Sequence, residues 1–315
     1  MTLASVQRRL ERLHQQSRIA AGSLIVSVFG DAVLPRGGGI WLGSLIGLMQ
    51  QLGVNERLVR TAVFRLVKDD WLSTETQGRR SNYHLTATGR RRFDEAARHI
   101  YAAQAPAWDQ RWRMLVLVGE VDSRTREALR RALHWHGFGE APPGNFLHPG
   151  ADLAEVLESL GADGLGAVLP QLMPLVATQP TLRPCASNAA LVQRAWNLEQ
   201  LGAGYAGFLA DYQPLLQELG GRKAPQPAPQ SAFLARSLMI HDWRRLLLQD
   251  PELPADLLPP QWPGAQARAL CSAIYARLLP ASEQYLDETL ELASGATPAS
   301  TALLAQRFQP PVAPA

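Results

Sequence analysis

Residues 37–92 read GGGIWLGSLIGLMQQLGVNERLVRTAVFRLVKDDWLSTETQGRRSNYHLTATGRRR, and this stretch decides the fold of the N-terminal part of the chain. Its apolar periodicity predicts a first helix over about residues 42–52 that ends at Gly53, because glycine readily adopts the left-handed conformation that closes many helices. Asn55 predicts the start of a second helix, since its side-chain oxygen can accept a backbone N–H bond in the first turn. The pattern is therefore helix, tight turn, helix.

The second helix has two chemically different faces. At about 100° per residue, the side that packs carries the apolar Val59, Ala62, Val63 and Leu66. A recognition helix needs such a division, because it must rest on its own domain while it presents polar side chains to base edges and phosphates. The side predicted to contact DNA carries Arg57, Arg60, Thr61, Phe64, Arg65 and Lys68.

Two alternating segments, WLSTETQ and SNYHLT, adjoin GRRS at residues 78–81 and predict a β-hairpin. Its tip carries Arg79, Arg80 and Ser81, which with Asn55 complete the predicted DNA-binding set. Arginines on such a wing can enter the minor groove or neutralise phosphates. An arginine-bearing helix face is by itself usually only solvated, but its combination with the turn and the wing favours DNA binding. Residues 90–92 are three further arginines, which are either DNA contacts or a solvated helix end.

Charge and cysteine content narrow the class of protein. Residues 1–99 hold 15 of the 31 Lys and Arg but only 8 of the 28 Asp and Glu, so the basic part is N-terminal. The only cysteines, Cys185 and Cys271, exclude a disulfide framework and fit the reducing cytoplasm. No apolar run approaches the ~18 residues that span a bilayer, and charged residues interrupt the first 20 positions. We expect a soluble cytoplasmic protein without a membrane segment.

Proline usage marks a change of architecture, because 22 of the 23 prolines follow residue 105 and a boundary near Pro106 is predicted. Beyond it, an apolar run at 112–121 predicts a strand, and a helix capped by Ser123 follows. An irregular hairpin, a helix within 151–160 and a second apolar run at 166–176 come next. This order predicts a small ferredoxin-like α+β unit over about 108–180.

The remainder is predominantly helical, interrupted by the Gly/Pro-rich segment GGRKAPQPAPQ at 220–230, which predicts a surface loop or linker. The tail from Gly295 onward consists largely of small residues and proline, a composition that predicts disorder. The predicted fold class is therefore α+β and multidomain. Its parts are a winged helix-turn-helix over 1–105, a ferredoxin-like domain over 106–184, a helical effector and dimerisation domain over 185–295, and a disordered tail over 296–315.

The motifs RGGGIWLGSL, NERLVRTAVFRLVKDDWL and GRRSNYHLTATG resemble the N-terminal domain of the PaaX family, and LMIHDWRRLLLQDPELPADLLPPQWPG with ALCSAIYARLLP resembles its later regions. The likeness covers nearly the whole chain. It implies repression of phenylacetic acid catabolism genes, a Cas2-like central domain, binding of double-stranded palindromic operator DNA as a homodimer, and release by phenylacetyl-CoA. None of these properties follows from composition or spacing.

An aryl acyl-CoA effector needs a dry slot for its ring and cations for its phosphates. The aromatic residues of the third region recur at near-helical intervals and are more typical of a helical core than of a ligand slot. No cofactor is expected. The candidate effector residues are Arg194, Arg236, His241, Arg244, Arg245, Arg268 and Arg277.

Two alternatives remain open. The Cas2 likeness suggests a metal-dependent nuclease that uses Glu120 or Asp122, yet carboxylates before a helix are ordinarily caps and no second ligand cluster is near, so we predict a regulator and not an enzyme. Leu3, Val6, Leu10 and Leu13 predict an amphipathic N-terminal helix. It packs either across a dimer or on its own winged helix.

Overall fold

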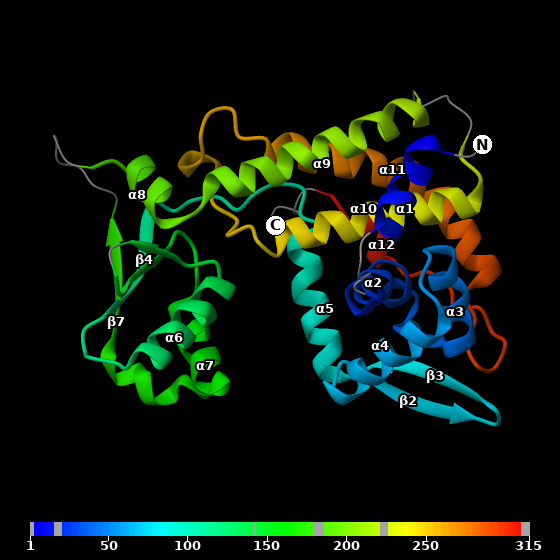
Figure 1. Cartoon of the computed structure of the whole chain (residues 1–315), viewed down its shortest axis with the longest axis horizontal. Helices are drawn as coiled ribbons and strands as arrows, with labels where there is room; N and C mark the ends of the chain where they lie inside the picture. The colour runs from blue at the N-terminus through cyan, green and yellow to red at the C-terminus, as the bar shows by residue number, and fades with distance from the viewer. Residues whose placement is uncertain (1–2, 16–20, 142, 179–185, 221–225, 310–315) are drawn as a thin grey trace. The chain divides into compact units, whose positions relative to one another are not determined.

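The computed structural model describes residues 3–15, 21–141, 143–178, 186–220 and 226–309. The chain forms two compact units (Figure 1). The first unit comprises Met1–Gln104, Tyr205–Leu246 and Gln266–Ala315, and the second comprises Ala105–Gly204 and Leu247–Ala265.

The N-terminal part of the first unit contains the helix, turn, helix and hairpin that the sequence predicts. Its three strands form an antiparallel sheet in the order β1-β3-β2. The elements are α1 (Ala4–Gln15), α2 (Ala21–Val28), the π-helical turn η1 (Phe29–Val33), the 3-10 turn η2 (Leu34–Arg36), β1 (Gly39–Trp41), α3 (Leu42–Gln51), α4 (Glu56–Lys68), β2 (Leu72–Gln77), β3 (Arg80–Leu85) and α5 (Ala87–Ile100).

The helices α9 (Leu198–Leu219), α10 (Pro229–Leu247), α11 (Gly264–Thr289) and α12 (Leu303–Gln306) supply the C-terminal part of this unit. The sequence predicted a separate helical domain over 185–295, but most of these helices share a core with residues 1–104. The indole of Trp243 donates to the backbone oxygen of Ile100 at 2.9 Å, and the hydroxyl of Ser44 donates to that of Thr289 at 2.6 Å. The N-terminal and C-terminal segments therefore fold together.

A buried carboxylate joins these segments. Asp31 in η1 lies 2.7 Å from the Arg236 guanidinium of α10 and 2.8 Å from that of Arg307. The hydroxyl of Tyr101 donates to Asp31 at 2.7 Å, and that of Tyr275 at 3.1 Å. Burial alone would raise the pKa of Asp31, but its attraction to the two arginines holds that pKa below its usual value. The carboxylate is ionised at neutral pH and links these segments of the chain through its ion pairs.

The C-terminal tail contributes to the same network, so the predicted disorder is wrong for residues 296–309. The backbone N–H of Thr301 donates to the oxygen of Pro35 at 2.7 Å, and Phe308 packs its ring edge-on against Tyr101. Arg307 is only 9% exposed. Its guanidinium lies 3.9 Å from the centre of the Tyr101 ring. The side chains of Arg307 and Phe308 anchor this segment, and no periodic sequence pattern predicts that they do so. Residues 310–315 lie outside the described residues.

The N-terminal helix α1 packs along α9 and α10, an arrangement that neither sequence-based alternative included. Arg9 forms a two-pronged ion pair with Asp242, with its Nε 2.7 Å from Oδ2. The hydroxyl of Ser5 donates to Glu218 at 2.6 Å. Leu3, Val6 and Leu13 are buried, which places the apolar stripe of α1 in the core of its own unit.

The second unit is built on an antiparallel sheet in the order β5-β6-β4-β7. Asp122, and not the expected Ser123, caps α6, because its side chain accepts the N–H groups of Arg124 and Thr125. The elements are β4 (Arg111–Leu117), α6 (Ser123–Trp135), β5 (Gly139–Ala141), β6 (Asn145–His148), α7 (Leu153–Leu160), the π-helical turn η3 (Gly161–Leu165), the 3-10 turn η4 (Gly166–Gln171), β7 (Leu172–Thr178), α8 (Asn188–Ala195) and the 3-10 turn η5 (Ala255–Leu257).

Apolar clusters cover both faces of the central strands of this sheet. Leu115, with α6 and α7, builds one apolar cluster, and Trp112 on the opposite face packs with α8 and η5. The apolar run 166–176 is a strand only from Leu172 onward, because its first part, which contains Pro170, forms the 3-10 turn η4. The predicted order of strand, helix, hairpin, helix and strand is otherwise present.

Replacement of Arg307 by alanine removes one of the two cations that neutralise buried Asp31. We expect Arg307→Ala to lower the free energy of unfolding of the first unit by about 3 kcal/mol, the usual scale for one broken buried ion pair. Urea unfolding followed by circular dichroism measures it. The exposed Arg98→Ala on α5 is the control, with an expected change within about 0.5 kcal/mol. Equal stability of the two variants would show that the tail does not anchor the unit.

Candidate nucleic-acid interface

The turn between α3 and α4 sets the position of the candidate recognition helix. Gly53 adopts φ 78°, and the N–H of Val54 donates to the oxygen of Met49 at 3.0 Å, which closes α3. Asn55 then caps α4 as predicted, because its side-chain oxygen accepts the N–H of Leu58 at 2.9 Å. Helix α4 packs on α2 and α3 (Figure 1). Both ends of the turn are fixed by local hydrogen bonds.

The two faces of α4 divide as the periodicity predicts. Val59, Ala62 and Val63 are buried on the side of α2 and α3. The outer side carries only exposed side chains, which are Arg57, Leu58, Arg60, Thr61, Phe64, Arg65 and Lys68. This outer side therefore offers four cations and one aromatic ring to a partner.

Two of the residues predicted to contact DNA have neighbours on the helix itself. Arg60 forms an ion pair with Glu56 at 2.7 Å, and both side chains are more than half exposed. The Thr61 hydroxyl donates to the backbone oxygen of Arg57 at 2.9 Å. Sequence reasoning missed Glu56, although a glutamate four residues before an arginine on a helix is a recognised pairing signal. Glu56 orients Arg60 without burying it.

The hairpin β2–β3 follows α4 in the chain and is antiparallel, as the alternating sequence predicts. Gly78 takes the first position of its two-residue turn with φ 62°, a conformation that glycine adopts without strain. Arg79 and Arg80 are exposed, and Ser81 is half-buried. The guanidinium of Arg80 lies 4.3 Å from the ring centre of Trp41 on β1. Sequence reasoning missed Trp41, because no short-range pattern indicates that β1 pairs with β3.

The run of arginines at the start of α5 has mixed surroundings. Arg90 lies 3.7 Å from Asp94, and Arg92 lies 5.0 Å from the ring centre of Trp71. Arg91 is exposed. At least two of the three thus have partners within the unit, and both interpretations, DNA contacts and a solvated helix end, stay open.

A helix-turn-helix whose outer face carries Arg and Lys side chains, followed by an arginine-tipped hairpin, defines a class of proteins that regulate transcription by binding DNA. Comparison with known proteins gives the family. The profile of the PaaX-like protein matches residues 20–89, that of the PaaX protein central Cas2-like domain matches 105–170, and that of the PaaX-like protein C-terminal domain matches 196–288.

The chain is 39% identical over 293 residues to the transcriptional repressor PaaX of Escherichia coli (strain K12), which covers 92% of this chain and 90% of that protein. It therefore belongs to the PaaX family, and this relative is a transcriptional regulator and not an enzyme. A solved structure of an uncharacterized protein from Mycobacterium tuberculosis is 28% identical, with a TM-score of 0.49, and the match covers 77% of this chain and 90% of that one.

Several candidate effector residues of the first unit have partners inside the fold. Arg236 is 1% exposed, and its guanidinium is held between Asp31 and Glu283. Arg268 is 9% exposed and donates to the backbone oxygens of His99 and Ala102. Neither arginine is placed to bind a phosphate, contrary to the prediction, because both are used inside the fold.

His241, Arg244 and Arg277 also have internal partners. The ring of His241 is buried and lies 3.0 Å from the hydroxyl of Ser27, and burial lowers its pKa to about 4, so it is neutral at physiological pH. Arg244 donates to the same hydroxyl at 3.0 Å, and Arg277 donates to the backbone oxygen of Gly220. Among the candidates, Arg194 in the second unit and Arg245 on α10 are exposed.

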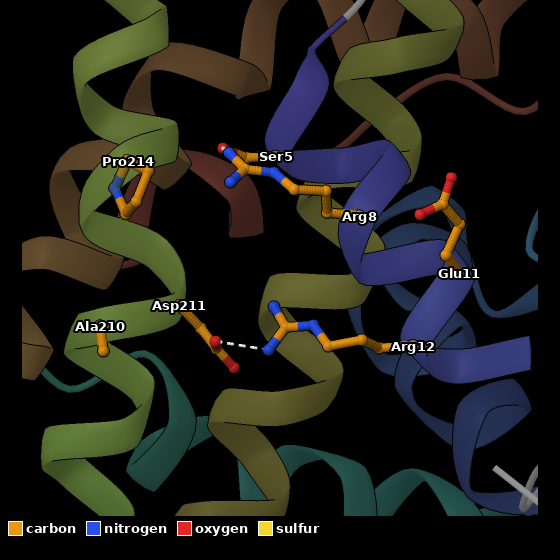
Figure 2. A pocket seen from close by; sticks show the side chains of 7 residues that line it. All are labelled: Ser5, Arg8, Glu11, Arg12, Ala210, Asp211 and Pro214. Carbon is orange, nitrogen blue, oxygen red and sulfur yellow. Dashed lines mark hydrogen bonds and ion pairs between the residues drawn. The ribbon is translucent and has the colours of Figure 1, made fainter. Parts of the chain in front are cut away.

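A groove of about 400 Å³ lies between α1 and α9 (Figure 2). Arg12 points across it to Asp211, 2.6 Å away, and Arg8 lies beside Ser5. The lining is largely charged and polar, and Arg12 already has a carboxylate partner. The charged groups of this groove are therefore largely paired and are not free to hold the phosphates of a ligand.

The carboxylates considered for a nuclease have ordinary surroundings. Asp122 is the helix cap described above, and the hydroxyl and backbone N–H of Thr125 lower its pKa. Glu120 is exposed. Within the described part of the chain, no group of three or more His, Cys, Asp or Glu side chains could hold a metal ion, and no helix is long and apolar enough to cross a membrane.

The wing arginines lead to a test of charge. If Arg79 and Arg80 contact phosphates, the double variant Arg79→Ala/Arg80→Ala releases fewer counterions on binding DNA. We expect the slope of log affinity against log salt to fall in magnitude by ~0.9 for each phosphate that the variant no longer neutralises. Fluorescence anisotropy across a salt series measures the slope, with the exposed Arg194→Ala of the second unit as control. An unchanged slope would remove these arginines from the interface.

Proposed function

We propose that this protein represses genes of phenylacetic acid catabolism by placing α4 in the major groove of an operator and the β2–β3 wing on the adjacent backbone. The observation that carries the proposal is the outer face of α4, where Arg57, Arg65 and Lys68 are exposed, together with the exposed arginines at the tip of the following hairpin. Guanidinium groups are the side chains most often used to read guanine and to hold phosphates. The winged helix-turn-helix assignment rests on this arrangement.

The second unit is assigned a ferredoxin-like fold in this proposal. Its four strands are all antiparallel to their neighbours, and each helix-containing connection links two strands that lie on either side of a third. That is the arrangement of the split βαβ units of ferredoxin-like domains. The match to the family's central Cas2-like domain over residues 105–170 supports the assignment.

We further propose that the second unit carries the dimer interface. Strand β7 is an edge strand and pairs only with β4 among the described strands. It exposes Met173 (46%), Leu175 (42%) and Val176 (60%), and Val118 at the end of β4 is 63% exposed. An apolar edge of this kind favours association with another chain. A two-fold dimer would place two recognition helices on the two half-sites of a palindromic operator.

The edge strand gives a direct test of dimerisation. Val176→Glu would place a charge, together with its symmetry mate, in the proposed apolar interface, so we expect at least about tenfold weaker dimerisation and weaker operator binding. Analytical ultracentrifugation measures the dimerisation constant. The matched control is Leu248→Glu, an apolar residue of similar exposure (51%) outside the strand. Unchanged dimerisation in Val176→Glu would exclude this edge as the interface.

The effector in this proposal is phenylacetyl-CoA, and no cofactor is required. Support comes from family membership and from Arg194 and Arg245, whose exposed guanidinium groups are accessible to phosphates. The effector would act by binding the DNA-free state more tightly than the DNA-bound state, and would thereby lower the affinity of the protein for operator DNA. By linkage, operator DNA would lower the affinity for the effector by the same factor, which is ~5- to 150-fold for typical allosteric couplings. The pocket itself is not assigned to particular residues.

The function is tested with a duplex enriched from a random DNA pool by the full-length protein. We expect sequence-specific binding that persists in a metal chelator without strand cleavage, and release by phenylacetyl-CoA but not by phenylacetate, which lacks the phosphates. Mobility-shift titrations measure both. Cleavage that the chelator abolishes would favour a nuclease, whereas release by phenylacetate, or by no aryl acyl-CoA, would overturn the effector class alone.

A further inference from the structure

The aromatic residue Phe64 occupies an unusual place on α4. It is 70% exposed, more than any other large apolar side chain of the described helix-turn-helix. At about 100° per residue it lies in the stripe of α4 farthest from the buried side, with Thr61 one turn before it and Lys68 one turn after. A phenyl ring thus stands in the middle of a polar, cationic surface.

This position restricts what Phe64 can contact. Val59 and Val63 face the core from the opposite side of α4, so the Phe64 ring contributes little to packing within the unit. If α4 enters the major groove, as the proposed function requires, its central stripe faces the base edges. The principal apolar group displayed there is the 5-methyl group of thymine. Burial of the ring against such a methyl group is favourable.

The neighbours of Phe64 strengthen this selectivity. The hydroxyl proton of Thr61 is donated to the backbone oxygen of Arg57, so Thr61 has no free donor for a base. Arg60 is oriented by Glu56, four residues earlier on the helix. The polar groups of Arg60 and Thr61 are therefore partly engaged within the helix, and the Phe64 ring is the main apolar surface of this stripe.

We propose that Phe64 is a base-reading residue that recognises thymine by packing its ring on the 5-methyl group. The proposal rests on the proposed function, because it requires α4 to bind duplex DNA. It adds a specificity rule to that function, in which each half-site contains a thymine that is read by apolar contact and not by a hydrogen bond.

The test replaces thymines by deoxyuridine, which lacks only the methyl group and pairs identically. The full-length protein first enriches duplexes from a random pool, and each thymine of the enriched site is then replaced in turn. We expect at least one position per half-site where deoxyuridine weakens wild-type binding about threefold to fivefold, the factor that burial of one methyl-sized group provides. At that position Phe64→Ala should bind the thymine and deoxyuridine duplexes equally.

Two control variants isolate the role of the ring. Phe64→Leu keeps an apolar side chain and should retain part of the preference for thymine. Leu58→Ala removes a different exposed apolar side chain of α4, away from the central stripe, and should leave the preference at that thymine intact. Because Phe64 is exposed, Phe64→Ala is expected to fold normally, which its thermal unfolding curve checks.

The outcomes separate this inference from the function on which it rests. Specific binding with no deoxyuridine-sensitive position, or with the same sensitivity in Phe64→Ala, overturns the role of Phe64 and leaves operator binding intact. Failure of the protein to enrich any duplex overturns the proposed function, and the thymine contact with it. Loss of deoxyuridine sensitivity in Phe64→Ala alone supports both.

Discussion

The buried carboxylate of Asp31 is the interaction on which the first unit depends. A charge in a protein interior is tolerated only when opposite charges and hydrogen bonds replace the water it loses. Here those groups come from distant parts of the sequence: Arg236 on α10, Arg307 beyond α12, and two tyrosine hydroxyls. Residues that are 205 and 276 positions apart from Asp31 must be in place before its charge is satisfied.

A second buried network reinforces the first. Arg36 is 3% exposed and is paired with Glu283 and Asp287 of α11, and it donates to the backbone oxygen of Pro298. Asn82 on β3 accepts the N–H of Ala293 at 2.6 Å, which ties the wing sheet to the segment after α11. The elements of the candidate DNA interface are thus connected to α11 and the segment after it by these hydrogen bonds and ion pairs.

Local sequence patterns predicted the parts of this protein that local physics determines. The turn at Gly53, the cap at Asn55 and the alternation of β2 and β3 each depend on residues a few positions apart, and the structure contains all three. The outer face of α4 followed from helical periodicity alone. The candidate DNA-binding residues could therefore be named from sequence, while the pairing of Arg80 with Trp41 could not.

The remaining predictions failed where single residues act over long separations. Arg236 was expected to bind a ligand phosphate. The local sequence cannot distinguish a solvated helical arginine from a buried one, because its partner Asp31 lies 205 positions away. The tail looked disordered because its composition is small and Pro-rich, yet Arg307 and Phe308 anchor it. Proline usage indicated a boundary near Pro106, but no sequence pattern indicated that the C-terminal helices belong to the same unit as the N-terminal residues.

The central claim is that the DNA-binding elements and the C-terminal helices are one folding unit. Thermal unfolding of the isolated fragment 1–104, followed by circular dichroism, tests it most directly. The fragment lacks every cation that pairs with Asp31 in the structure, as well as the partners of Arg36 and Ser44. The claim predicts that the fragment shows no cooperative transition, and a sharp transition near that of the full-length protein would contradict it.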